Sequence, residues 1–145
     1  MDLSKFPESL SDLMVDKNIN AASLNDALGF SNSLVNKYLS GNYLPTVDNL
    51  IRMANFFNCS TDYLLGIDFE NHANTFKKCP PFGEQILFLC EYYKISRYKL
   101  RQKTGIAESL IRYWVQGKYQ PSLPNILRIA EALDCSVDFV LGREL

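Results

Sequence analysis

Cysteine and histidine, two side chains that commonly carry catalysis or bind metals, are few in this chain of 145 residues and are not grouped. The four cysteines, Cys59, Cys79, Cys90 and Cys135, include no pair in CxxC spacing, and the one histidine is His72. A zinc site or a thioredoxin-type pair needs closely spaced ligands or thiols, and His72 lies in a polar stretch that resembles no catalytic relay. We therefore expect no enzyme activity, no metal and no cofactor. The cysteines should be free thiols, with Cys59 and Cys135 in the apolar core.

Basic residues, which could neutralise the phosphates of a nucleic acid, are unevenly distributed. The net charge of the whole chain is −1, which taken alone argues against a nucleic-acid partner. Residues 6–68 hold three basic and seven acidic residues, whereas residues 82–144 hold nine basic and seven acidic ones. Five of these nine lie close together in the sequence: Lys94, Arg97, Lys99, Arg101 and Lys103. Such a run also fits a solvated helix face, but it gives the C-terminal half a capacity for phosphate contact.

The chain contains an internal repeat. Residues 6–68 and 82–144 align without a gap at an offset of 76, and 19 of the 63 paired positions are identical. We therefore expect two copies of one module, in domains 1–68 and 82–145, joined by a linker over residues 69–81. The linker ends in two prolines, which block helix continuation, and its Phe76 and Cys79 could pack on a neighbouring domain.

Each module is predicted to fold as five short helices without strands. The expected N-terminal residues or caps in the first module are Pro7, Asn20, Ser31, Thr46 and Ser60, and those in the second include Ser96, Ser122 and Ser136. Glycines that can end helices recur at positions 29, 41 and 66 and again at 105, 117 and 142. Apolar residues recur at helical spacing over 50–57, and no segment alternates apolar and polar residues as a strand would.

The spacing within each module resembles that of the phage-repressor (Cro/XRE-type) helix-turn-helix family. The pattern L-x4-G-[FI]-x3-[LS]-[VI]-x2-[YW]-x2-G-x-Y-x-P-[ST] covers Leu24–Thr46 and, nearly as well, Leu100–Ser122. Both copies then continue to a C-S-x-D-[YF]-[LV]-L-G ending. The resemblance implies an all-α fold of two similar five-helix bundles in tandem, each with its third helix in the major groove of double-stranded DNA.

The resemblance also indicates candidate DNA-binding residues. A helical wheel places polar side chains on the outer face of the third helix of the first module, among them Asn32, Ser33, Asn36 and Lys37, and Asn42 after the helix could add a contact. The corresponding set in the second module is Glu108, Ser109, Arg112, Tyr113, Gln116 and Lys118, and Arg97 and Lys99 begin its second helix. Asn and Gln can bond adenine, Arg can bond guanine through two hydrogen bonds, and Glu can accept from cytosine N4.

Two positions depart from the family pattern. Asn25 and Arg101 stand where the family usually has a small residue, at the close crossing of the second and third helices. Ala21 and Arg97 likewise replace a glutamine that often touches the DNA backbone in this family.

Together these features predict a cytoplasmic, non-enzymatic transcriptional regulator that binds specific sequences in double-stranded DNA. We expect the second module to supply most of the affinity, since affinity for DNA depends largely on phosphate neutralisation. No membrane segment and no small-molecule ligand are indicated, and homodimer formation is left open. The alternative is a protein-interaction module, of the anti-repressor or dimerisation type, that keeps the fold without binding DNA in one or both domains. The acidic first module gives this alternative its support.

Overall fold

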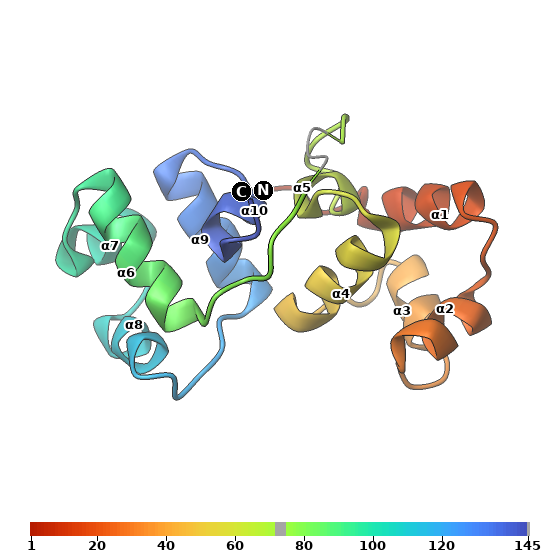
Figure 1. The fold of residues 1–145 in the computed structure, drawn as a ribbon, viewed down its shortest axis with the longest axis horizontal. Coiled ribbons are helices and arrows are strands. Elements are labelled where there is room, and N and C mark those ends of the chain that lie inside the picture. The colour runs from red at the N-terminus through yellow and green to blue at the C-terminus, as the bar shows by residue number, and fades with distance from the viewer. Residues whose placement is uncertain (72–74, 145) are drawn as a thin grey trace. The chain divides into compact units, whose positions relative to one another are not determined.

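The computed structural model describes residues 1–71 and 75–144, and these form helices joined by short turns (Figure 1). The chain divides into two compact units, Met1–Asn74 and Thr75–Leu145. Within the described part, the only pairing of strand type is an isolated antiparallel bridge between Phe76 and Glu144. The expected all-α fold with two bundles in tandem is confirmed. None of the described helices is long and apolar enough to cross a bilayer.

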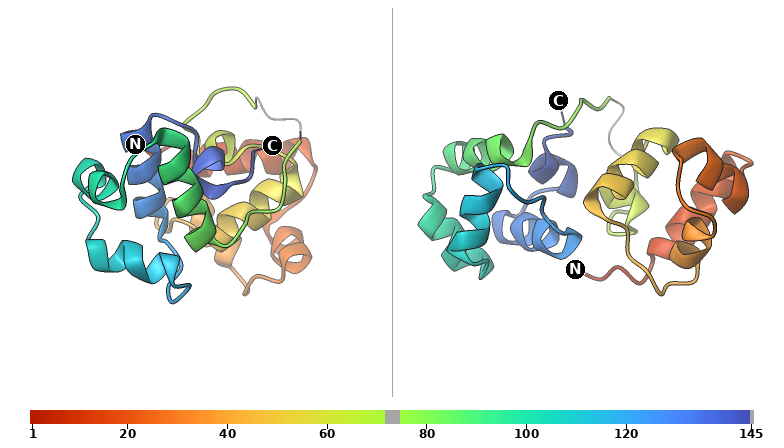
Figure 2. Two further views of the ribbon diagram at one scale, coloured as in Figure 1. Left: turned by 60° about the vertical axis from the view of Figure 1, so that its left-hand side comes forward. Right: turned by 90° about the horizontal axis from the view of Figure 1, so that it is seen from below.

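Each unit contains five helices among its described residues, and Figure 2 shows them from two further sides. The first unit holds α1 (Phe6–Asp16), α2 (Ala21–Leu28), α3 (Leu34–Leu39), α4 (Val47–Phe57) and α5 (Thr61–Leu64). The second unit holds α6 (Phe82–Tyr93), α7 (Arg97–Thr104), α8 (Glu108–Val115), α9 (Leu123–Leu133) and α10 (Val137–Leu141).

Six helices begin at side-chain caps that the sequence predicts. In each case the capping oxygen accepts the backbone N–H three residues later, which satisfies a donor that has no partner within the helix. The six caps are Asn20, Thr46, Ser60, Ser96, Ser122 and Ser136. Proline lies in the first turn of α1 and of α9, where its missing N–H costs no helical hydrogen bond.

The start of α3 differs from the prediction, which placed its cap at Ser31. The helix begins only at Leu34, and Ser33 before it adopts a left-handed conformation with φ of 69° and makes no capping bond. Asn25 on α2 takes over this role, because its buried side-chain oxygen accepts the N–H of Val35 at 3.1 Å. The polar residue at this unusual position therefore ties α2 to the first turn of α3.

An aromatic pair fixes the third helix of each unit to the first. Phe6 on α1 and Tyr38 on α3 pack edge to face with the ring centroids 5.9 Å apart, and Phe82 and Trp114 on α8 do so at 5.3 Å. Both pairs are buried and occupy equivalent positions of the repeat. Burial raises the pKa of the Tyr38 phenol, whose oxygen accepts a hydrogen bond from the side-chain amide of Asn49 at 3.1 Å.

Gly83 allows α6 and α8 to approach each other closely. A Cβ atom added at this residue would lie 2.5 Å from the carbonyl oxygen of Trp114 and 2.9 Å from that of Val115. These distances are far below normal van der Waals contact, and the contacted atoms belong to the backbone. The absence of a side chain at Gly83 thus sets the position of α8.

The segment just before α6 packs on the second unit. Arg143, which follows α10, places its guanidinium 3.7 Å from the ring centroid of Phe76, and its carbonyl accepts the N–H of Lys77 at 2.9 Å. The same guanidinium donates to the carboxylate of Asp138 at 3.0 Å, and both side chains are almost fully buried. The sequence suggests a packing role for Phe76, and Arg143 provides the contact. His72 lies outside the described residues.

Candidate nucleic-acid interface

The outer face of α8 presents a line of polar side chains. Its inner face is anchored by the buried Ile111 and Trp114. Three exposed residues, Glu108, Arg112 and Gln116, follow one another at intervals of four, so they lie on the same side of the helix. Ser109 is also exposed, and Tyr113 is half-buried beside this line. The sequence-predicted residues of α8 and its C-terminal end therefore lie along the outer part of this helix, with Tyr113 only partly exposed.

Glu108 and Arg112 form an ion pair along this surface. The guanidinium of Arg112 donates to the carboxylate of Glu108 at 3.2 Å, and the two side chains are 46% and 54% exposed. A pair this exposed contributes only about 0.3–0.5 kcal/mol to stability. The pair is therefore easily broken, and its main effect is to extend the arginine along the helix face.

The ring of Tyr113 contacts side chains at the end of α8 and just after it. Its ring meets Tyr119 edge to face with 5.2 Å between the centroids, and the Lys118 ammonium lies 5.7 Å from the Tyr113 centroid. The Arg112 guanidinium lies 5.5 Å from the same ring. These cation–aromatic contacts hold two positive charges at the end of the helix while leaving both residues exposed.

The second helix of this unit adds further positive charge. Ser96 caps α7, and the exposed Arg97 and Lys99 lie in its first turn. Arg101 is half-buried, with its guanidinium 4.8 Å from the ring centroid of Tyr98. Arg101 thus lies against the exposed ring of Tyr98 on the same helix, whereas Arg97 and Lys99 are exposed.

The first unit presents a corresponding surface with little charge. Asn32, Ser33, Asn36 and Lys37 are exposed, as the helical wheel predicts, and so is Asn42 after the helix. The ammonium group of Lys37 lies 5.1 Å from the ring centroid of the exposed Tyr43, which repeats the arrangement of a cation beside a tyrosine.

Two other basic residues of the first unit are engaged in internal contacts. Arg52 donates to the carbonyl of Leu28 at the end of α2 and lies 5.0 Å from the ring centroid of Phe30. Lys17 donates to the carbonyl of Phe56 at 3.1 Å. Within residues 6–68, only one basic side chain, Lys37, is therefore placed on the exposed face of the third helix. No group of three or more metal-binding side chains in the described part of the chain is arranged to hold an ion.

Comparison with known protein families gives one match in each unit. The helix-turn-helix family matches residues 10–64, and the Cro/C1-type HTH DNA-binding domain family matches residues 87–142. No curated protein and no solved structure shows a significant match to the chain. Domains of the Cro/C1 type are typical of DNA-binding regulators that are not enzymes. The chain is therefore a tandem pair of Cro/XRE-type helix-turn-helix domains, a type of domain that supports DNA binding in transcription regulators.

Proposed function

We propose that the chain regulates transcription by binding specific sequences in double-stranded DNA, chiefly through α7 and α8 of the second unit. The observation that supports this proposal is the line of exposed side chains Glu108, Arg112 and Gln116 on one side of α8, together with exposed basic residues in the first turn of α7 and directly after α8. In this arrangement α8 lies in the major groove, and α7 contacts the sugar–phosphate backbone.

The spacing on α8 suits contacts with neighbouring base pairs. Arg112 and Gln116 are four residues apart, which is about 6 Å along a helix and close to the rise of two base pairs. Arg112 can donate two hydrogen bonds to guanine, and Gln116 can bond adenine through both groups of its amide. Glu108, one turn earlier, can accept from cytosine N4 once its ion pair with Arg112 opens.

Phosphate contacts come from residues at the edges of this surface. Arg97 and Lys99 in the first turn of α7 lie where the helix-turn-helix places its second helix across the backbone, and Lys118 follows α8. These contacts supply affinity without sequence preference, whereas the side chains on α8 supply the preference.

The first unit contributes mainly to specificity in this proposal. Asn32 and Asn36 can each bond adenine, but the unit offers only Lys37 for phosphate neutralisation on this face. The three basic and seven acidic residues of 6–68 would also oppose approach to DNA. We therefore assign most of the binding free energy to the second unit.

The test is selection of bound duplexes from a random pool by the full chain at two salt concentrations. We expect one enriched motif and weaker binding at higher salt. Arg112→Ala should relax the preference at one base pair and cost about 1–3 kcal/mol there. Enrichment of no motif, with binding independent of salt, would contradict the proposal and favour a protein-interaction role.

A further inference from the structure

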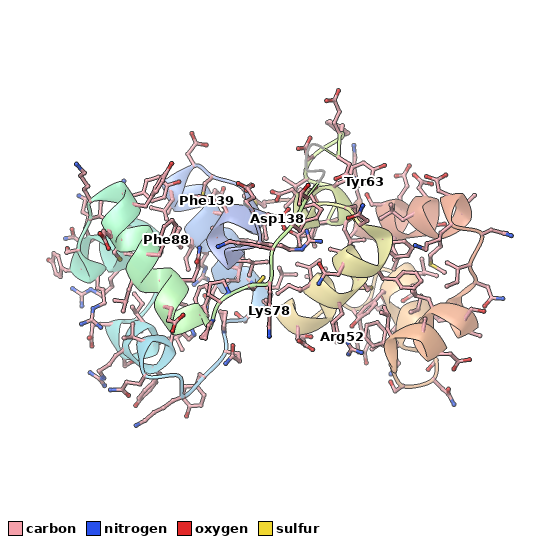
Figure 3. All side chains as sticks on the ribbon, in the orientation of Figure 1. Arg52, Tyr63, Lys78, Phe88, Asp138 and Phe139 are labelled. Atoms are coloured by element: carbon pink, nitrogen blue, oxygen red, sulfur yellow. The ribbon has the colours of Figure 1, made fainter. Side chains whose placement is uncertain are left out.

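The second unit carries an exposed aromatic face on α6 and α10. Leu87, Phe88 and Tyr92 on α6 keep 48%, 46% and 58% of their surface exposed. Phe139 on α10 lies beside them, with its ring centroid 6.1 Å from that of Phe88 and 5.0 Å from that of Tyr92, and Figure 3 labels Phe88 and Phe139 on these two helices. We call these four residues, together with Tyr93, the aromatic face. It is formed by α6 and α10, whereas the proposed DNA surface is formed by α7 and α8.

The first unit shows that the fold does not require this face. At the positions equivalent to Leu87, Phe88 and Tyr92, the gapless repeat places Ser11, Asp12 and Asp16, which are all exposed. The same bundle therefore forms with a polar and acidic surface at this site. Large apolar side chains that a fold does not need and leaves half-exposed typically mark an interaction site.

We propose that the aromatic face is a homodimer interface, in which α6 of one chain packs antiparallel to α6 of a second copy. The charges at the two ends of the helix favour this occupant. Glu84 is exposed in the first turn of α6, and Lys94 is exposed directly after its last turn. An antiparallel pair places each Glu84 near the Lys94 of the other chain, whereas a parallel pair would bring like charges together. The antiparallel arrangement also aligns the two helix dipoles favourably.

The size of the face fits the centre of such an interface. Three large side chains that are about half exposed present on the order of 300–400 Å² of surface. A standard interface buries about 800 Å² on each partner, so the aromatic face would form the core and the charged helix ends would form the rim. We expect a reversible dimer with a dissociation constant in the micromolar range, formed without DNA.

The experiment is sedimentation equilibrium of the full chain without DNA. A variant that gives α6 the first unit's own residues, Leu87→Ser with Phe88→Asp and Tyr92→Asp, should weaken dimerisation by at least about 100-fold, since it removes the apolar core of the interface. The matched control changes the equivalent residues of the first unit, Asp12→Ala with Asp16→Ala, and should leave the dissociation constant unchanged. Circular dichroism and Trp114 fluorescence would show that the variants fold.

A charge exchange tests the antiparallel arrangement with less risk to folding. Glu84→Lys and Lys94→Glu should each raise the dissociation constant about fivefold, because each makes two exposed attractive pairs repulsive, and the double variant should restore it. A wild-type chain that stays monomeric at about 200 µM, well above a micromolar dissociation constant, would overturn the proposal. In that case the aromatic face would be a binding site for a different protein. A dimer that persists in the triple variant, or a double variant that restores nothing, would also overturn it.

Discussion

Gly83→Ala tests whether the close approach of α6 and α8 depends on the absence of a side chain at Gly83. Two effects oppose each other in this substitution. Alanine favours a helix over glycine by up to about 1 kcal/mol, but its Cβ would lie 2.5 Å from the Trp114 carbonyl oxygen and 2.9 Å from that of Val115. Because these contacts are with backbone, no side-chain rotation can relieve them, and overpacking of this kind costs about 1–3 kcal/mol. We expect a net destabilisation of the second unit by about 1–2 kcal/mol, the overpacking cost reduced by part of the helix-propensity gain.

The assay is urea unfolding followed by the fluorescence of Trp114, which is the one tryptophan in the sequence and reports on the second unit. In thermal unfolding followed by the same fluorescence, a loss of 1 kcal/mol should lower the melting temperature of a unit this size by about 4–8 °C. Glu91→Ala, at an exposed position of the same helix, is the matched control and should change stability by less than about 0.5 kcal/mol. If Gly83→Ala instead stabilised the unit, helix propensity would outweigh the contact, and the reasoning would be refuted.

Three further substitutions test single contacts. Asn25→Ala should destabilise the first unit by about 1–3 kcal/mol, since the buried Val35 N–H loses its acceptor; unchanged hydrogen exchange at that amide would contradict this. Arg143→Met should cost the second unit about 3–5 kcal/mol in urea unfolding, because the buried carboxylate of Asp138 loses its ion pair with Arg143. The added change Asp138→Asn should recover part of the loss, and no recovery would contradict the role of the pair. Glu108→Gln should change stability by less than about 0.5 kcal/mol. It should strengthen DNA binding at low salt, because it removes a negative charge near the DNA phosphates. A large loss of affinity for the selected site alone would contradict this and identify Glu108 as a base contact.

The sequence predicted most of the fold because the local rules agreed with one another. The caps at Asn20, Thr46 and Ser60 satisfy backbone donors of their own helices, so short-range spacing was sufficient to find them. The gapless repeat then carried the same pattern to the second unit. The cap at Ser31 was wrong because the acceptor for the start of α3 comes from Asn25, on a different helix.

Contacts between distant residues were beyond what spacing could show. Arg143 appeared only as one of nine basic residues of its module, yet it is buried between Asp138 and Phe76. Arg52 likewise counted as an available charge, although it binds the end of α2. The helical wheel predicted the exposure of the polar residues on the third helices correctly except for Tyr113, which is half-buried. The Glu108–Arg112 pair was not anticipated, although the spacing of four residues permits it.

The most direct test of the central claim, that the second unit supplies most of the affinity for DNA, is the salt dependence of binding by the full chain. Affinity for the selected duplex should be measured by fluorescence anisotropy across a range of salt concentrations. Arg97→Ala should reduce the log–log salt slope by about 0.9, the value for one phosphate contact, and should weaken binding equally on selected and random duplexes. Lys17→Ala removes the same charge from the first unit, where Lys17 contacts the Phe56 carbonyl, and should leave the slope unchanged. An unchanged slope in Arg97→Ala, or an equal change in Lys17→Ala, would contradict the account.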